Sequence, residues 1–138
     1  MHQQNLADFI WSVADVLRGD FKQSEYGRII LPFTVLRRLE CVLEPTREKV
    51  AAQYQLFKDS SVDLDLILPG IAGARFYNVT TFSLETVGAT DTRANLEEYV
   101  AKFSANARQV FEHFGFDNWL ARLESANLLF LVAQKFAA

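Results

Sequence analysis

The chain has 138 residues, of which 50% are hydrophobic and 22% are charged, with a formal net charge of −3. This length and balance fit one globular domain with its own core and argue against disorder. The charge is uneven: residues 1–58 hold eight Lys or Arg against seven Asp or Glu, whereas residues 59–138 hold six against ten. A stand-alone nucleic-acid-binding domain is usually more basic. Any DNA contact must therefore use a local patch.

The N-terminal residues and the cysteine content indicate the compartment. The first residues, MHQQNLADFIW, lack the basic and apolar regions of a secretory signal. The single cysteine, Cys41, has no partner for an internal disulfide. No apolar run approaches the roughly 18 residues that a membrane span needs. We therefore expect a cytoplasmic protein with no membrane segment.

The first predicted helix begins after Asn5, a good N-cap, and ends near Gly19. Its apolar residues recur at spacings of three and four, which is the helical period. They are Leu6, Phe9, Ile10, Val13 and Leu17. Trp11 lies off this stripe, next to acidic residues, and is available to pack against another element.

A second helix is expected to begin near Ser24 and Glu25. Pro32 should kink or restart it, because proline lacks the N–H group and clashes with the preceding turn. Pro45 suits the first turn of a third helix over roughly residues 46–57.

The helical period weakens between residues 59 and 90, where leucines alternate and glycines and β-branched residues follow. This pattern predicts a long irregular connection. From Asp91 helices resume, with a short one around Val110, another capped by Asp117 and a last one after Asn127. The sequence therefore predicts an all-α fold, a multi-helix orthogonal bundle in a single domain with an irregular central connection.

Catalytic motifs are missing from the sequence. The glycines form neither a dinucleotide-binding pattern nor a P-loop. Cys41, His2 and His113 are too few and too scattered for the common zinc patterns, and nothing nearby activates Cys41 as a nucleophile. Glu97 and Glu98 point about 100° apart on a helix, as on a solvated face. We predict no catalytic, cofactor-binding or metal-binding residue.

The adjacent arginines Arg37 and Arg38 point in different directions on a helix. Arg37 falls almost opposite the apolar stripe and should be available, whereas Arg38 borders the stripe and should be structural. Spacing favours an ion pair between Arg37 and Glu40, three residues on, over a phosphate contact. Three further cations would widen a basic surface if they converge: Arg28, Arg18 and Lys22.

Several motifs together resemble one family. In chain order they are Trp11, Ala14-Asp15, Leu17-Arg18-Gly19, Tyr26, Leu31-Pro32, Leu36-Arg37-Arg38-Leu39, Asn95-Leu96, Tyr99, Phe103-Ser104, Asn127-Leu128-Leu129 and Lys135-Phe136. They resemble the N-terminal helical domain of the modification subunit, HsdM, of type I restriction-modification systems. The likeness covers nearly the whole chain.

The resemblance implies a function for a larger protein. Such subunits transfer a methyl group from S-adenosylmethionine to the N6 of adenine, using a Rossmann-like domain downstream of the helical one. They act on double-stranded DNA with a specificity subunit, a second modification subunit and a restriction subunit. The helical domain resembles a clamp that closes the assembly around DNA and senses existing methylation, and it holds no catalytic residue.

The sequence departs from the complete family pattern in its catalytic elements. An adenine methyltransferase of this type needs an Asn/Asp-Pro-Pro-Phe/Tyr segment and a glycine-rich cofactor turn. The prolines of this chain, Pro32, Pro45 and Pro69, are isolated. We therefore expect an excised domain or a truncated gene product that neither binds S-adenosylmethionine tightly nor methylates DNA.

Three hypotheses follow. The first is an accessory domain that clamps DNA and contacts other subunits. Its candidate DNA contacts are Arg37, Arg28, Arg18 and Lys22. The second is a protein-docking module that never touches DNA, with Trp11 and Trp119 as interface residues; the acidic C-terminal half favours it. The third is a freestanding helical regulator.

Overall fold

The structure is a computed structural model that describes residues 6–80 and 82–137. Its α-helices are α1 (Leu6–Leu17), α2 (Tyr26–Leu43), α3 (Arg47–Phe57), α4 (Leu64–Ala72), α5 (Thr92–Ala101), α6 (Ala105–Phe114), α7 (Phe116–Ser125) and α8 (Leu129–Ala137). Two short 3₁₀ turns precede α2 and α3: η2 (Gln23–Glu25) and η3 (Glu44–Thr46). The all-α prediction is confirmed.

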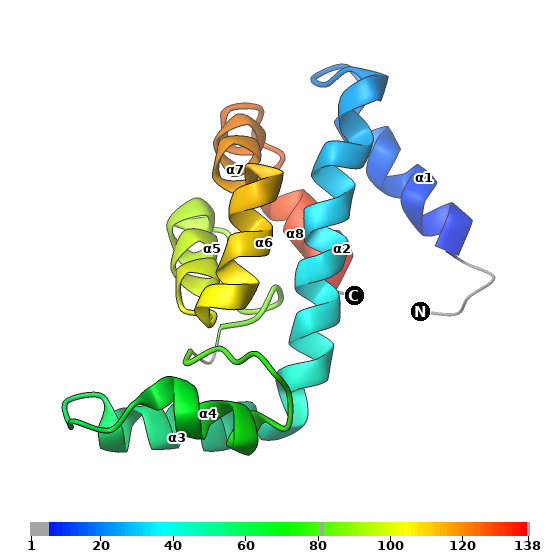
Figure 1. Cartoon of the computed structure of the whole chain (residues 1–138). Helices are drawn as coiled ribbons and strands as arrows, with labels where there is room; N and C mark the ends of the chain where they lie inside the picture. Colours follow the sequence, from blue (N-terminus) through cyan, green and yellow to red (C-terminus); the bar gives the residue numbers. More distant parts are fainter. Residues whose placement is uncertain (1–5, 81, 138) are drawn as a thin grey trace.

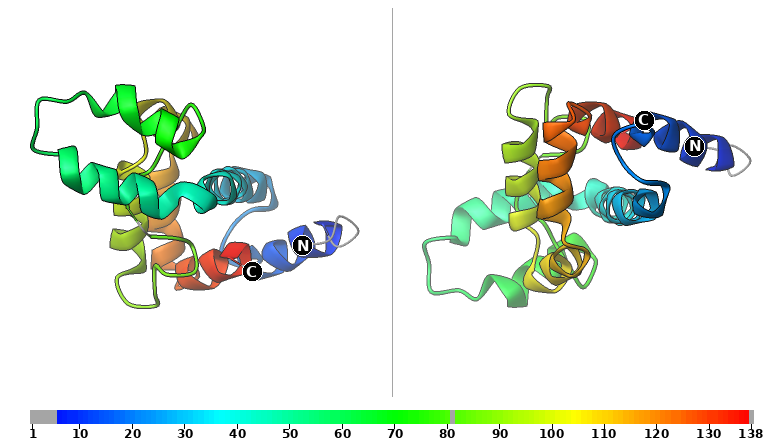
Figure 2. Two further views of the ribbon diagram at one scale, coloured as in Figure 1. Left: turned by 90° about the horizontal axis from the view of Figure 1, so that it is seen from below. Right: turned by 90° about the horizontal axis from the view of Figure 1, so that it is seen from above.

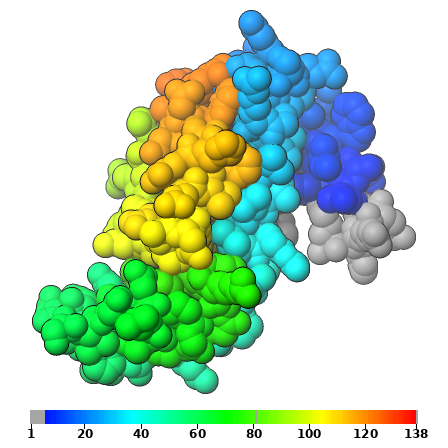
Figure 3. Space-filling view, in the orientation of Figure 1, coloured from blue at the N-terminus to red at the C-terminus, as the bar shows by residue number. Residues whose placement is uncertain are grey.

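The long helix α2 is the centre of the bundle (Figure 1). Helices α1 and α8 contact it on one side, and α6 and α7 contact it on the other, with α5 behind them. Helices α3 and α4 pack against each other and form a lobe at one end of the molecule (Figure 3). Views from below and above show the end of α8 beside α1 (Figure 2).

Helix α1 follows the prediction closely. It spans residues 6–17, and Gly19 behind it has a φ of 98°, a conformation that glycine adopts without steric cost. The predicted cap Asn5 and the histidine His2 lie outside the described residues.

The prediction that Pro32 restarts a helix is wrong. Helix α2 continues through it as one element of 18 residues. Pro32 lies near the start of α2, where its missing N–H group removes one hydrogen bond, to the carbonyl of Arg28. Its ring is buried, and this apolar burial offsets part of the cost.

The predicted irregular connection over residues 59–90 is partly wrong, because α4 lies within it. Asp63 caps this helix: its carboxylate accepts a hydrogen bond from the Asp65 N–H at 3.0 Å. Pro69 and Gly70 lower the intrinsic helix propensity of the segment, and packing against α3 compensates. Asp117 is also not a cap; it lies in the first turn of α7, and Gly115, with a φ of 64°, precedes that helix.

A row of aromatic side chains runs through the core and joins most of the helices. Neighbouring ring centroids are 5.0–5.7 Å apart, a distance at which aromatic pairs add to the hydrophobic gain. This aromatic row consists of Phe9, Phe136, Phe33, Phe116, Phe111, Phe103 and Tyr99. It connects α1, α8, α2, α7, α6 and α5 in that order.

None of the helices in the described part of the chain combines the length and the apolar character needed to cross a bilayer.

Candidate functional site

Three of the four predicted DNA-contact cations gather around the turn between α1 and α2. Arg18 directly follows α1, Lys22 lies in the turn, and Arg28 is in the first turn of α2; all three are exposed. We call these three residues the cationic corner. Arg18 forms an exposed ion pair with Asp15 at 2.8 Å, and such pairs contribute little to stability. The corner therefore keeps mobile positive side chains at one end of α2.

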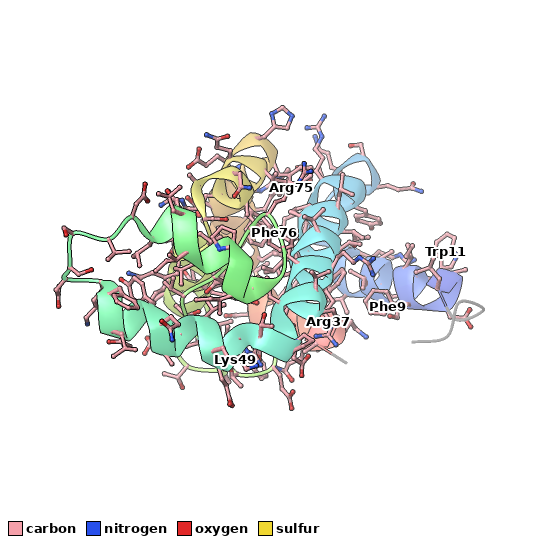
Figure 4. All side chains as sticks on the ribbon, turned by 60° about the horizontal axis from the view of Figure 1, so that its bottom comes forward. Phe9, Trp11, Arg37, Lys49, Arg75 and Phe76 are labelled. Carbon is pink, nitrogen blue, oxygen red and sulfur yellow. The ribbon has the colours of Figure 1, made fainter. Side chains whose placement is uncertain are left out.

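Arg37, the fourth candidate, lies elsewhere. Nine residues separate it from Arg28 on α2, which is about 13 Å along the helix axis. Figure 4 shows Arg37 on the part of α2 that passes α8. The four cations predicted from the sequence thus form a group of three and a separate arginine.

The cationic corner is held in place by Arg122 of α7, which sequence reasoning missed. Its Nη1 lies 2.7 Å from Glu25 Oε2, and its guanidinium stacks on Phe21 and Trp119 at 5.1 and 4.7 Å from the ring centroids. Glu25 Oε1 also accepts a hydrogen bond from the backbone N–H of Lys22. The hydrogen bond from Arg122, and next the one from Lys22, hold the pKa of Glu25 below its ordinary value.

Trp119 is a core residue, so its prediction as an interface residue does not fit the structure. Only 7% of its surface is exposed. Arg122 covers its ring, and the fold leaves no face of Trp119 for a partner. The helical period of α7 did not distinguish a buried tryptophan from an exposed one.

Glu40 is the most deeply buried charged side chain among the described residues, with 3% of its surface exposed. Its Oε2 lies 2.7 Å from Arg37 Nη1, as the predicted spacing of three residues allows. Its Oε1 accepts hydrogen bonds from the Leu84 N–H at 2.7 Å and from the Tyr99 hydroxyl at 3.0 Å. The carboxylate therefore ties α2 to α5 and to the segment between α4 and α5.

The predicted roles of Arg37 and Arg38 are reversed. Arg38 is exposed, whereas the Arg37 side chain is 35% exposed and held by Glu40. The helical wheel treated the apolar stripe as the whole buried face, but the segment around Leu84 covers the Glu40 side of α2 as well. Burial opposes the charge of Arg37, yet the hydrogen bond to Glu40 outweighs it, and the pKa of Arg37 is raised.

An apolar groove lies between α1 and α2, with a volume of about 920 Å³. Its walls include Ile10 and Trp11 from α1, Leu31 from α2 and Phe136 from α8; Cys41 also lines it. We call this feature the α1–α2 groove. Trp11 is 62% exposed and projects from α1 (Figure 4). Its availability to another element agrees with the sequence prediction.

Part of the apolar stripe predicted for the first helix is not buried. Leu6 and Ile10 are 51% and 42% exposed, and both line the α1–α2 groove. Val13 and Leu17, further along the same stripe, are fully buried. Helix α1 therefore meets the bundle with its C-terminal half and presents apolar surface with its N-terminal half.

The comparison with family models connects this geometry to a known family. The model of the HsdM N-terminal domain matches residues 6–136, from the first residue of α1 into the last turn of α8. The chain belongs to the HsdM N-terminal domain family. This confirms the resemblance found in the sequence and places the domain among the subunits of type I restriction-modification systems. Comparisons with curated proteins and with solved structures found no match.

Proposed function

We propose that this HsdM N-terminal domain is an accessory domain of an S-adenosylmethionine-dependent DNA adenine-N6 methyltransferase. It contributes DNA clamping, methylation-state sensing and subunit assembly, and the chemistry belongs to other parts of the enzyme. The observation that carries the proposal is the family match over residues 6–136. The partners are double-stranded DNA, a specificity subunit, a second modification subunit and a restriction subunit.

The cationic corner is the surface that best suits the DNA part of this role. Lys22 and Arg28 are exposed, and neither forms a side-chain ion pair with another described residue. Lysine and arginine contacts to phosphate add affinity without reading the sequence, and base reading is left to the specificity subunit. Arg37 suits this role less well, because Glu40 already compensates its charge.

DNA binding by the reconstituted modification complex tests the corner. In the Lys22→Ala/Arg28→Ala double variant we expect weaker binding to a cognate duplex. The slope of log affinity against log salt should flatten by about 0.9 for each lost phosphate contact. Fluorescence anisotropy between about 50 and 200 mM salt measures both quantities.

The matched control is Lys49→Ala/Lys58→Ala, which removes the same charge from exposed positions on and just after α3, away from the corner (Figure 4). This variant should retain the parental salt slope. An unchanged slope in the corner variant would remove Lys22 and Arg28 from the DNA interface.

The α1–α2 groove favours a second candidate, a docking module that does not touch DNA. Photocrosslinking of the assembled enzyme to DNA separates the two. Adducts within residues 1–58 support clamping. Their absence from an intact, DNA-bound complex supports docking alone.

A further inference from the structure

We propose that the α1–α2 groove is an intramolecular docking site: in intact HsdM, the polypeptide that follows α8 turns back and covers it with apolar side chains. The inference rests on membership of the HsdM family and is independent of DNA binding. It assigns to the exposed Trp11 a partner within its own subunit.

The composition of the groove determines the chemistry of its occupant. Ile10, Trp11 and Leu31 are 42%, 62% and 51% exposed and lie on facing helices. A contiguous apolar surface of this kind marks an interaction site more often than a free surface. The Thr34 hydroxyl in the groove already donates to the Ile30 carbonyl at 2.8 Å, and Arg37 already pairs with Glu40. Few polar groups remain to be satisfied, so the fitting occupant is apolar.

The position of α8 indicates where this occupant comes from. Phe136 lines the groove, and its ring contacts Phe9 of α1 at 5.0 Å and Phe33 of α2 at 5.3 Å. These contacts fix the last turn of α8 against the groove. Figures 1 and 2 both show the end of α8 beside α1 and α2.

The family adds the remaining step. The matched domain is the N-terminal domain of HsdM, so the next part of an intact HsdM begins where α8 ends, at the edge of the groove. A segment tethered by a short linker acts at an effective concentration in the millimolar range. It therefore reaches the groove ahead of a separate chain of equal intrinsic affinity.

Cys41 provides a native probe of the proposal. It is exposed, it lines the groove, and it is the single cysteine of the 138-residue chain. The rate of its alkylation by N-ethylmaleimide is measured in this chain and in intact HsdM, without DNA or other subunits. Mass spectrometry of the peptide that contains Cys41 separates it from other cysteines of the intact subunit. We expect alkylation to be at least tenfold slower in intact HsdM, at all protein concentrations.

A pair of variants tests whether apolar contact causes this protection. In intact HsdM, Ile10→Asp/Leu31→Asp should return the alkylation rate toward that of the 138-residue chain. Leu56→Asp/Leu66→Asp makes the same change at positions that are 70% and 80% exposed outside the groove, and protection should persist. Far-UV circular dichroism confirms that each variant is folded.

Three results would overturn the proposal. The first is equal alkylation of Cys41 in the short chain and in intact HsdM. The second is protection that rises with HsdM concentration, which assigns the groove to a second copy. The third is protection that appears only after the specificity subunit is added. Because no DNA is present, none of these results bears on DNA clamping by the cationic corner.

Discussion

At the scale of single residues, the buried carboxylate of Glu40 determines how Arg37 is used. Glu40 accepts three hydrogen bonds, from Arg37, Leu84 and Tyr99. Burial and then the nearby charge of Glu40 raise the pKa of Tyr99 above its ordinary value, so the hydroxyl stays protonated as a donor. A satisfied buried carboxylate specifies the position of each of its partners.

Removing this carboxylate should destabilise the domain. We expect Glu40→Ala to lower the free energy of unfolding by roughly 2–4 kcal/mol, because two buried donors lose their acceptor at about 1–3 kcal/mol each. Urea unfolding measures the change. The exposed Glu48→Ala variant should stay within about 0.5 kcal/mol of the parent.

A double-mutant cycle locates the origin of that loss. Tyr99→Phe should cost less in the Glu40→Ala background than in the parent, because the two groups share one hydrogen bond. A loss below about 0.5 kcal/mol in Glu40→Ala would show that Glu40 does not hold the three segments together.

At the scale of elements, α7 fastens the turn between α1 and α2. Arg122 reaches Glu25, 97 residues earlier in the chain, and stacks on Phe21 beside it. The turn that carries Lys22 is therefore positioned by a helix from the other end of the sequence. This contact gives the cationic corner a fixed base under mobile side chains.

The contact predicts a pH dependence of stability. The pKa of Glu25 is lowered in the folded chain, whereas an unfolded glutamate titrates near about 4.3. A lowered pKa means that the unfolded chain binds more protons, so this contribution to stability is present above about pH 4.3 and is lost as pH falls through the folded value. Glutamine cannot ionise. The stability difference between the parent and Glu25→Gln should therefore shrink between pH 6 and pH 3 in urea unfolding.

The same measurement in an Arg122→Ala background provides the control. Without Arg122 the largest cause of the lowered pKa is gone. The pH-dependent difference between glutamate and glutamine should then be smaller. An equal difference in both backgrounds would assign the effect to other contacts.

At the scale of the whole molecule, the aromatic row joins the N-terminal and C-terminal helices into one core. Phe33 is central to it: its ring contacts Phe136 at 5.3 Å and Phe116 at 5.1 Å, and none of its surface is exposed. It connects α2 with α8 and α7, which are distant from it in sequence. The groove and the corner both depend on this arrangement.

Truncating Phe33 should therefore affect the whole domain. Phe33→Ala is expected to cost about 3–5 kcal/mol of unfolding free energy, from lost burial and an unfilled cavity. Phe33→Leu should cost considerably less, because it keeps most of the apolar volume. Val110→Ala, at a position that is 40% exposed on α6, is the control and should cost less than either. A small effect of Phe33→Ala in urea unfolding would contradict the central role of the row.

The sequence by itself determined the helical class, most helix positions, the Arg37–Glu40 spacing and the family, because these depend on local periodicity and on motifs in order along the chain. Helix α4 was missed, since Pro69 and Gly70 weaken the local signal that packing on α3 overcomes. Only the tertiary structure decided that Glu40 is buried, that Trp119 belongs to the core and that Trp11 borders a groove. Each depends on contacts between segments far apart in the chain, such as the 59 residues between Glu40 and Tyr99, and local periodicity carries no record of them.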